Sequence, residues 1–215
     1  MSGSFTLNQE NTKTALEMMS DITKIFSVCQ IKYTLTAGTL LGIIRENRLL
    51  PWDKDVDLRI FREDEKKIMA AIPKIKKAGY FVRVRYQEKE DEPLKLGEPR
   101  ILKIYSKKFF FFKGNVMMDC FIANRFENAY IWSCGGIKKY TKKAVPAKYY
   151  DDLNTVQFDN KLYFIPSDHE NYLTYRYGNW RVPQKKWRFT KDDGAIVASD
   201  HKKMKKKTRD WPFFY

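Results

Sequence analysis

Three carboxylates spaced two residues apart stand in the segment Pro-Trp-Asp-Lys-Asp-Val-Asp, at Asp53, Asp55 and Asp57. The apolar and β-branched run at 58–61 predicts a strand that starts at or just before Asp55. Residues two apart in a strand share a face, so Asp55 and Asp57 point the same way. Adjacent carboxylates repel unless a cation lies between them, and Mg²⁺ takes such oxygen ligands together with substrate phosphates. A solvated strand end would show the same spacing.

A turn of small residues precedes this strand. Gly38 and Thr39, then Gly42, come after a predicted short strand at 33–36 and open an apolar run at 40–44 that predicts a short helix. Backbone amides at such a helix start, with a hydroxyl beside them, can hold a phosphate. Arg45 comes seven residues after Gly38 and is expected to serve a different phosphate or carboxylate. A glycine turn followed within twenty residues by a same-face carboxylate pair favours a phosphate-handling site.

A lone acid, Asp119, lies in the otherwise apolar predicted strand 116–122. Burying a carboxylate without a partner or a cation is costly, which makes Asp119 the best candidate for a further carboxylate at the same site. An ion pair with an Arg or Lys is the alternative, because the chain has 41 of these residues. His169 has no second ligand at a useful spacing, and we interpret it as a surface residue.

Two stretches of the chain resemble the LicD/fukutin family, a branch of the nucleotidyltransferase superfamily. The first combines Gly-Thr-Leu-Leu-Gly at 38–42 with Arg45 and the Pro-Trp-Asp-x-Asp-Val-Asp segment at 51–57. The second, at 171–183, has a Tyr-Leu helix, Tyr-Gly and a following proline. Lys54 departs from the acidic or His residue often found there. The resemblance touches both ends of roughly residues 33 to 183, and its first part is the more specific.

The resemblance implies an α+β fold, with a nucleotidyltransferase-like mixed β-sheet flanked by helices. It also implies a metal-dependent enzyme that moves a phospho-alcohol, such as phosphocholine or ribitol phosphate, from a CDP-linked donor to a glycan hydroxyl. The expected cofactor is Mg²⁺ or Mn²⁺. The catalytic acids would be Asp55, Asp57 and Asp119. The metal would be bound by these three acids and by Asp53. The residues expected to bind phosphate are Gly38, Thr39 and Arg45.

Two functions from other classes remain open. One is a nucleotidyltransferase that adds nucleotides to RNA or to a small molecule, and the other is a non-catalytic, basic nucleic-acid-binding module. The net charge of +15 favours both, because a basic protein attracts polyanions. The Trp52-Asp53 extension argues against the first, and the presence of all three carboxylates argues against the second.

Length and composition predict one domain, 1–215, with a basic tail from about residue 200 that we interpret as solvated. No run approaches 18 apolar residues, and the N-terminus lacks the features of a signal peptide. We therefore expect no transmembrane segment and a cytoplasmic location, or the Golgi lumen if an anchor precedes the domain. Three cysteines without a C-x-x-C pair fit a reducing compartment.

Periodicity and punctuation residues predict the remaining elements. Helices are expected at 8–30, with Asn11 or Thr12 as candidate caps, at 63–78, bent or shortened by Pro73, and from a capping box at 167–170 to Tyr177. Strands are expected at 80–86 and 101–105, with a hairpin at 155–165. A second hairpin would join 109–112 to 116–122 through a turn at 113–115. The segment 87–99 is predicted to be a loop, and the aromatic and lysine-rich segment 130–150 either a ligand-binding segment or a surface loop.

Overall fold

The computed structural model describes residues 6–108, 112–184 and 187–199, so the basic tail and Phe109 to Phe111 lie outside the described residues. The helices are α1 (Gln9–Val28), α2 (Ala37–Glu46), α3 (Glu65–Lys77), α4 (Lys148–Asp151) and α5 (His169–Tyr177). The strands are β1 (Tyr33–Leu35), β2 (Val56–Phe61), β3 (Phe81–Tyr86), β4 (Pro99–Lys108), β5 (Phe112–Phe126), β6 (Ala129–Cys134), β7 (Thr141–Pro146), β8 (Leu153–Phe158), β9 (Lys161–Pro166) and β10 (Ile196–Ser199). Short 3₁₀ turns occur at Arg62–Asp64 and Ile137–Lys139.

The long strand β5 is the centre of a mixed sheet. The first part of β5 lies between β4 and β2. Strand β4 pairs on its other edge with β3, and β2 pairs on its other edge with β1. The end of β5 pairs with β6, which is followed in the sheet by β7 and β10. The β2–β5 pair is parallel, whereas the other described pairs are antiparallel. Strands β8 and β9 form a separate hairpin. The predicted α+β fold with a mixed sheet and flanking helices is confirmed.

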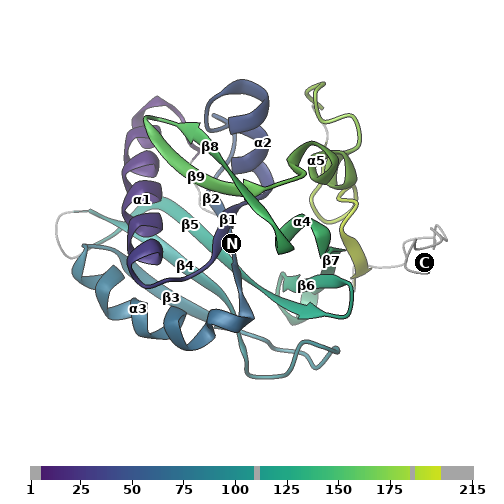
Figure 1. The fold of residues 1–215 in the computed structure, drawn as a ribbon. Helices are drawn as coiled ribbons and strands as arrows, with labels where there is room; N and C mark the ends of the chain where they lie inside the picture. Colours follow the sequence, from purple (N-terminus) through teal and green to yellow (C-terminus); the bar gives the residue numbers. More distant parts are fainter. Residues whose placement is uncertain (1–5, 109–111, 185–186, 200–215) are drawn as a thin grey trace.

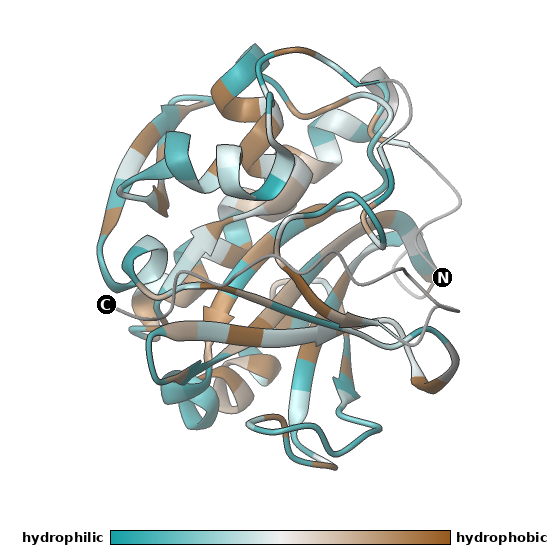
Figure 2. Cartoon of the chain, turned by 90° about the vertical axis from the view of Figure 1, so that its right-hand side faces the viewer, coloured by the Kyte–Doolittle hydropathy of each residue, from teal (hydrophilic) through white to brown (hydrophobic). Residues whose placement is uncertain are grey.

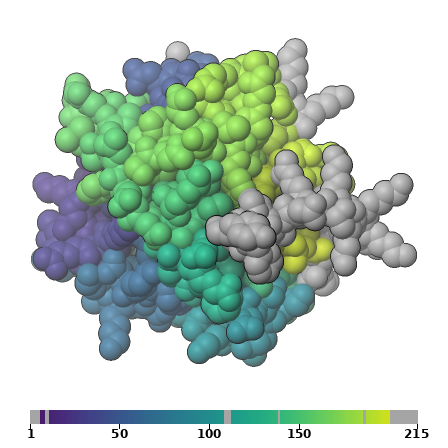
Figure 3. All heavy atoms as spheres, turned by 45° about the vertical axis from the view of Figure 1, so that its right-hand side comes forward, coloured from purple at the N-terminus to yellow at the C-terminus, as the bar shows by residue number. Residues whose placement is uncertain are grey.

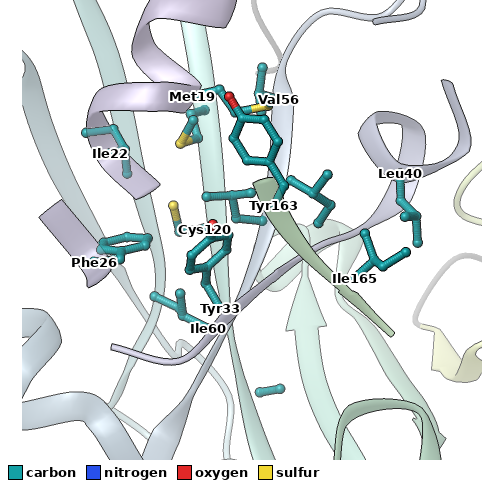
Figure 4. Packing of buried hydrophobic residues seen from close by; sticks show 14 of the residues in the cluster. Met19, Ile22, Phe26, Tyr33, Leu40, Val56, Ile60, Cys120, Tyr163 and Ile165 are labelled. Carbon is teal, nitrogen blue, oxygen red and sulfur yellow. The ribbon is translucent and has the colours of Figure 1, made fainter. Parts of the chain in front are cut away.

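Helix α1 forms because its apolar residues recur every three or four positions and give one continuous apolar face. Met19, Ile22 and Phe26 on this face are fully buried against Val56 and Ile60 of β2 and their neighbours (Figure 4). The same apolar layer covers the helix-facing side of β4 and β5. Figure 2 shows hydrophobic residues along the central strands, as a buried sheet requires.

Helices α1 and α3 lie together along one side of the molecule, and α2 and α5 lie near each other at the other side (Figure 1). Helix α3 presents Ile68, Ala71 and Ile75 to the core. It continues four residues past Pro73, which is exposed, so Pro73 does not shorten the helix, and the alternative of a bend stays a prediction. No described helix is both long and apolar enough to cross a bilayer.

Two predicted helix caps and one predicted turn are wrong. Helix α1 is capped by Asn8, whose Oδ1 accepts from the amide of Asn11, because the helix begins earlier than the candidate caps. Helix α5 follows Asp168, and no side chain caps its first turn, so the capping box is absent. The predicted turn at 113–115 lies inside β5, because pairing of Lys108 with Phe112 extends the β4–β5 ladder beyond it.

The segment 130–150 is not a surface loop. It comprises most of β6, then β7 and most of α4, and all six residues of β6 are buried. Its aromatic residues pack inward, since the Tyr130 and Tyr150 rings lie 5.2 and 5.7 Å from that of Phe61. Aromatic side chains bury large apolar areas, and this layer covers the other side of β2.

A buried ion network fastens the chain after α5 to β7. Asp193 is fully buried and accepts from Nε and Nη2 of Arg176, both at 2.6 Å, and from Nζ of Lys143 at 2.7 Å. Although burial opposes it, the charge of Arg176 and then that of Lys143 lower the pKa of Asp193 to about 2. In Figure 3 the residues of α5 and of the segment after it, coloured from green to yellow, lie together on the surface.

We predict that Asp193→Asn lowers the free energy of unfolding at pH 7 by about 3 kcal/mol, because it leaves two buried cations without their counter-ion. A depressed carboxyl pKa stabilises the fold above the unfolded value and is lost as pH falls toward the folded one. The difference between variant and wild type should therefore shrink between about pH 4 and pH 2, measured by urea denaturation. Asp192→Asn, at the exposed neighbouring position, is the control, and an equal loss in both variants would contradict the prediction.

Candidate active site

The parallel pairing of β2 with β5 brings two predicted site residues side by side. Asp57 is directly opposite Asp119 in the register. Adjacent strands are about 4.8 Å apart, so the two carboxylates start from neighbouring backbone positions. Asp55 comes immediately before β2 and lies two residues from Asp57. The structure therefore gathers Asp55, Asp57 and Asp119 at one place on the sheet, which we call the acid cluster.

The acid cluster is partly buried and its negative charge is poorly compensated: Asp119 is buried, and Asp55 and Asp57 are half-buried. Within the part of the chain that the structure describes, the carboxylates of Asp55 and Asp57 accept no hydrogen bond, and desolvating an unpaired carboxylate is costly. Burial and then the charges of Asp119 and Asp53 raise the pKa of Asp55 to about 7. The pKa of Asp57 is raised well above its usual value by burial and then by Asp55. The negative charge of the cluster is therefore only partly compensated.

Lys103 of β4 supplies one positive charge to the cluster. It lies opposite Asp119, and its Nζ donates to both carboxylate oxygens, at 2.7 and 2.5 Å. The ion pair left open as an alternative for Asp119 is therefore present. The pKa of Asp119 is nevertheless raised, because burial outweighs the attraction of Lys103. Lys103 was missed in the sequence, although it too is a lone charge in an apolar run, the signal that singled out Asp119.

Gly38 lies in the first turn of α2, and its missing side chain makes room for Asp53. A Cβ on Gly38 would collide with Oδ2 of Asp53, so the glycine lets this carboxylate approach the start of the helix. Burial raises the pKa of Asp53, and its Oδ1 accepts from the amide of Lys54 at 3.0 Å. The charge of Asp53 also raises the pKa values of Asp55 and Asp57, which places it close to the acid cluster.

The other two predicted phosphate-binding residues make contacts within the protein. The hydroxyl of Thr39 is buried and accepts from the backbone amide of Asp57 at 2.9 Å, fixing α2 against the start of β2. Arg45 is about 9 Å farther along the helix axis and donates to Glu46 and to the carbonyl of Trp180. It is therefore not part of the acid cluster, and its phosphate role stays a prediction.

A buried arginine lies on the same side of β2, two residues beyond Asp57. Arg59 is 1% exposed, and its guanidinium carbon lies 3.8 Å from the ring centroid of Trp132. Its Nε has no hydrogen-bond partner among the described residues. Cation–π contacts of this kind stabilise a desolvated arginine. Arg59 is thus a buried positive charge on the side of β2 that carries Asp57, a feature that the sequence did not reveal.

The chemistry of the donor set fits a hard divalent cation. Carboxylate oxygens are the preferred protein ligands of Mg²⁺ and Mn²⁺, and Asp55 and Asp57 have no competing hydrogen-bond donor in the described chain. As they stand, no three acidic, His or Cys side chains among the described residues converge closely enough to hold an ion. Lys103 occupies both oxygens of Asp119, so coordination by that residue requires a rotation of one of the two side chains.

We predict that Asp55→Asn stabilises the metal-free protein at pH 8 by roughly 1–3 kcal/mol, since it removes repulsion within the cluster. A raised carboxyl pKa gives stability that is complete below the unfolded value, near pH 4, and is lost as pH rises through the folded value of about 7. The gain should thus vanish near pH 4. The measurement is urea denaturation in EDTA, with the exposed Asp152→Asn as control. A variant no more stable than wild type at pH 8 would refute the electrostatic account.

Comparison with known proteins identifies the family to which the chain belongs. The sequence model of the "LicD/FKTN/FKRP, nucleotidyltransferase domain" matches residues 30–168, which include the whole acid cluster and Lys103. A Rickettsia prowazekii protein, RP689, is 25% identical over 190 residues, covering 86% of this chain and 58% of that protein. Human ribitol-5-phosphate transferase FKTN is 27% identical over 176 residues, covering 81% of this chain and 35% of FKTN.

Among solved structures, the antibiotic-resistance factor ANT(2'')-Ia is similar with a TM-score of 0.47 and 15% sequence identity, over 83% of this chain and 79% of that one. The chain spans 58% of RP689, 35% of human FKTN and 26% of a third relative, the Rickettsia typhi protein RT0683. The family match covers well over half of the chain. The protein therefore belongs to the LicD/FKTN/FKRP family, within its nucleotidyltransferase domain.

Proposed function

We propose that this protein transfers a phospho-alcohol, such as ribitol phosphate or phosphocholine, from a CDP-linked donor to a hydroxyl of a glycan. The reaction would depend on Mg²⁺ or Mn²⁺ held by Asp55 and Asp57, with Asp119 and Asp53 completing or orienting the site. Membership of the family and similarity to ribitol-5-phosphate transferase FKTN support the transferred group. The donor, the metal and the acceptor are part of the proposal.

The observation that carries the proposal is the register of β2 against β5. It aligns Asp57 with Asp119 beside Asp55, in a partly buried cluster whose negative charge is only partly compensated. A merely structural pair of carboxylates would be solvated or fully paired, because unpaired buried charge destabilises a fold. Phosphoryl transfer requires a group of carboxylates that can bind a cation, even though these carboxylates destabilise the metal-free protein.

Different residues of the chain would position the cation, the donor phosphates and the acceptor hydroxyl. Asp55 and Asp57 would hold the cation at the donor phosphates, and Thr39 keeps α2 fixed to the backbone of Asp57. The amides at the start of α2 would face the same phosphates, and Gly38 leaves room there for the carboxylate of Asp53. Asp119 would orient the acceptor hydroxyl, and Lys103 holds that carboxylate in place.

In the reaction, the acceptor oxygen forms a bond to the phosphorus that carries the alcohol, while the bond from this phosphorus to the CMP oxygen breaks. CMP leaves with the electron pair, and the acceptor proton passes to a carboxylate of the acid cluster. A bound divalent cation supplies charge to the phosphate oxygens and lowers the pKa of the attacking hydroxyl. The protein itself contributes alignment and a buried environment in which these charges act strongly.

The test of the proposal is Asp57→Asn, assayed with CDP-ribitol and CDP-choline on a panel of glycan acceptors. We expect CMP release to fall at least roughly a hundredfold, because charge stabilisation in the transition state is lost. Asp152→Asn, a matched change at an exposed position, should keep wild-type rates. Full activity of Asp57→Asn would refute the metal assignment. Incorporation of NTPs with pyrophosphate release, in place of CMP release, would indicate the nucleotidyltransferase alternative.

Metal binding can be measured without turnover. A ligand that binds only the native state raises its apparent stability. Mg²⁺ or Mn²⁺ should therefore raise the melting temperature of the wild type and of Asp152→Asn, and should leave that of Asp57→Asn unchanged. An equal shift in all three proteins would place the cation elsewhere.

A further inference from the structure

The row of residues that contains the acid cluster continues across the sheet to its outer edge. In register, Asp57 is opposite Asp119, Asp119 is opposite Lys103, and Lys103 is opposite Arg83 of β3. Directly paired residues point to the same side of a sheet, so the row changes from acidic to basic on one face. With strands about 4.8 Å apart, Arg83 is about 14 Å from Asp57 across the sheet.

Further basic side chains extend over the same side of these strands. Nζ of Lys107 lies over the ring of Phe81, at 5.5 Å from its centroid, and Phe81 is two residues before Arg83. Nζ of Lys113 lies over the ring of Tyr105, at 3.4 Å, and Tyr105 is two residues after Lys103. Arg85 follows Arg83 by two residues. We define the basic face as the set Arg83, Arg85, Lys103, Lys107 and Lys113.

The basic face lies on the side of β3, β4 and the start of β5 where, among the described residues, no helix packs. The opposite side is packed beneath α1 and α3, where Leu102 and Ile104 are fully buried in the main core. On the basic face Arg83, Lys107 and Lys113 are exposed, and Arg85 is partly exposed. A sheet face that carries exposed cations in place of a packed layer is available to an external ligand.

The positive charge of this face exceeds its negative charge. Lys103 is paired with Asp119, and Arg85 approaches Glu88 at 3.7 Å. Arg83, Lys107 and Lys113 have no ion pair with an acidic residue of the described chain. Three uncompensated cations on one exposed surface attract an anion, and more strongly one with several charges.

We propose that the basic face binds the acceptor, and that this acceptor is an acidic glycan carrying phosphate or other anionic groups along its chain. The inference rests on the proposed function and adds the class of acceptor. Helix α2 contacts the acid cluster from the side of β2, whereas the basic face adjoins it from the side of β4. The donor phosphates and the acceptor anions would thus approach the acid cluster from opposite sides.

The same surface is poorly suited to single-stranded nucleic acid. Such ligands are held by bases that stack on open aromatic rings. The two rings of the basic face, Phe81 and Tyr105, already have the ammonium groups of Lys107 and Lys113 over them. These contacts keep the rings from bases and hold the charges above the sheet, where anionic groups on a flexible glycan can reach them.

The experiment measures binding of fluorescein-labelled heparin hexasaccharide, as an acidic glycan probe, by fluorescence anisotropy. Neutral maltohexaose and a twelve-residue single-stranded DNA are the comparison ligands. The variant Arg83→Gln/Lys107→Gln/Lys113→Gln removes the uncompensated cations of the basic face. The matched control, Lys66→Gln/Lys76→Gln/Lys77→Gln, removes the same charge from exposed positions of α3 on the other side of the sheet.

We expect the basic-face variant to bind the heparin hexasaccharide at least roughly tenfold more weakly at low salt, and with a shallower salt dependence, because fewer counter-ions are released. The α3 control should lose less than roughly threefold, and maltohexaose should bind none of the proteins measurably. Equal losses in both triple variants would show attraction by net charge alone and overturn the proposal. A loss confined to the DNA would also overturn it, in favour of a nucleic-acid surface.

Separate controls test whether the variants fold and whether binding is independent of catalysis. The three side chains are exposed, so melting temperatures close to that of the wild type are expected. If the triple variant is unstable, the single change Arg83→Gln should still weaken heparin binding more than Lys66→Gln. The binding measurement is made in EDTA and needs no turnover, so its result is independent of the Asp57→Asn assay. Loss of transfer in Asp57→Asn with unchanged heparin binding is expected if both proposals hold.

Discussion

The mutual repulsion of partly buried carboxylates is the constraint on which the site depends. The parallel pairing of β2 with β5 puts Asp57 beside Asp119, and the chain direction puts Asp55 beside both. Burial prevents water from screening these charges, so the pKa of Asp55 rises to about 7. The fold tolerates the repulsion because the surrounding sheet is extensively packed: the strand residues Val56, Leu58 and Cys120 are fully buried on the helix-facing side.

The protein contains two clusters of charged side chains, and the carboxyl pKa is lowered in one and raised in the other. Around Asp193, the positive charges of Arg176 and Lys143 outweigh the cost of burial, and the pKa of this carboxyl falls to about 2. At the acid cluster, Lys103 is the one described residue that donates to a carboxylate, and burial still raises the pKa of Asp119. The first arrangement stabilises the chain after α5, while the second leaves a deficit of positive charge. Perturbed carboxyl groups of the second kind are typical of functional sites.

Two features that were expected to contact a ligand directly have structural roles around the cluster. The absence of a side chain at Gly38 accommodates Asp53, and the hydroxyl of Thr39 accepts from the amide of Asp57. The motif therefore couples the start of α2 to the strand that carries the acids. A small residue and a hydroxyl are needed there for packing, whatever ligand the neighbouring amides hold. This coupling explains why the two parts of the motif occur together.

The sequence by itself determined the helices and strands with strong periodicity, the shared face of Asp55 and Asp57, and the unusual position of Asp119 in an apolar run. These properties follow from local geometry, since side-chain direction alternates along a strand wherever that strand lies. Only the tertiary structure decided that Asp57 faces Asp119, that Lys103 bonds to Asp119, and that the 130–150 segment forms buried strands. Register between distant strands depends on how whole faces pack, and a shift of one residue would turn every side chain to the other side of the sheet.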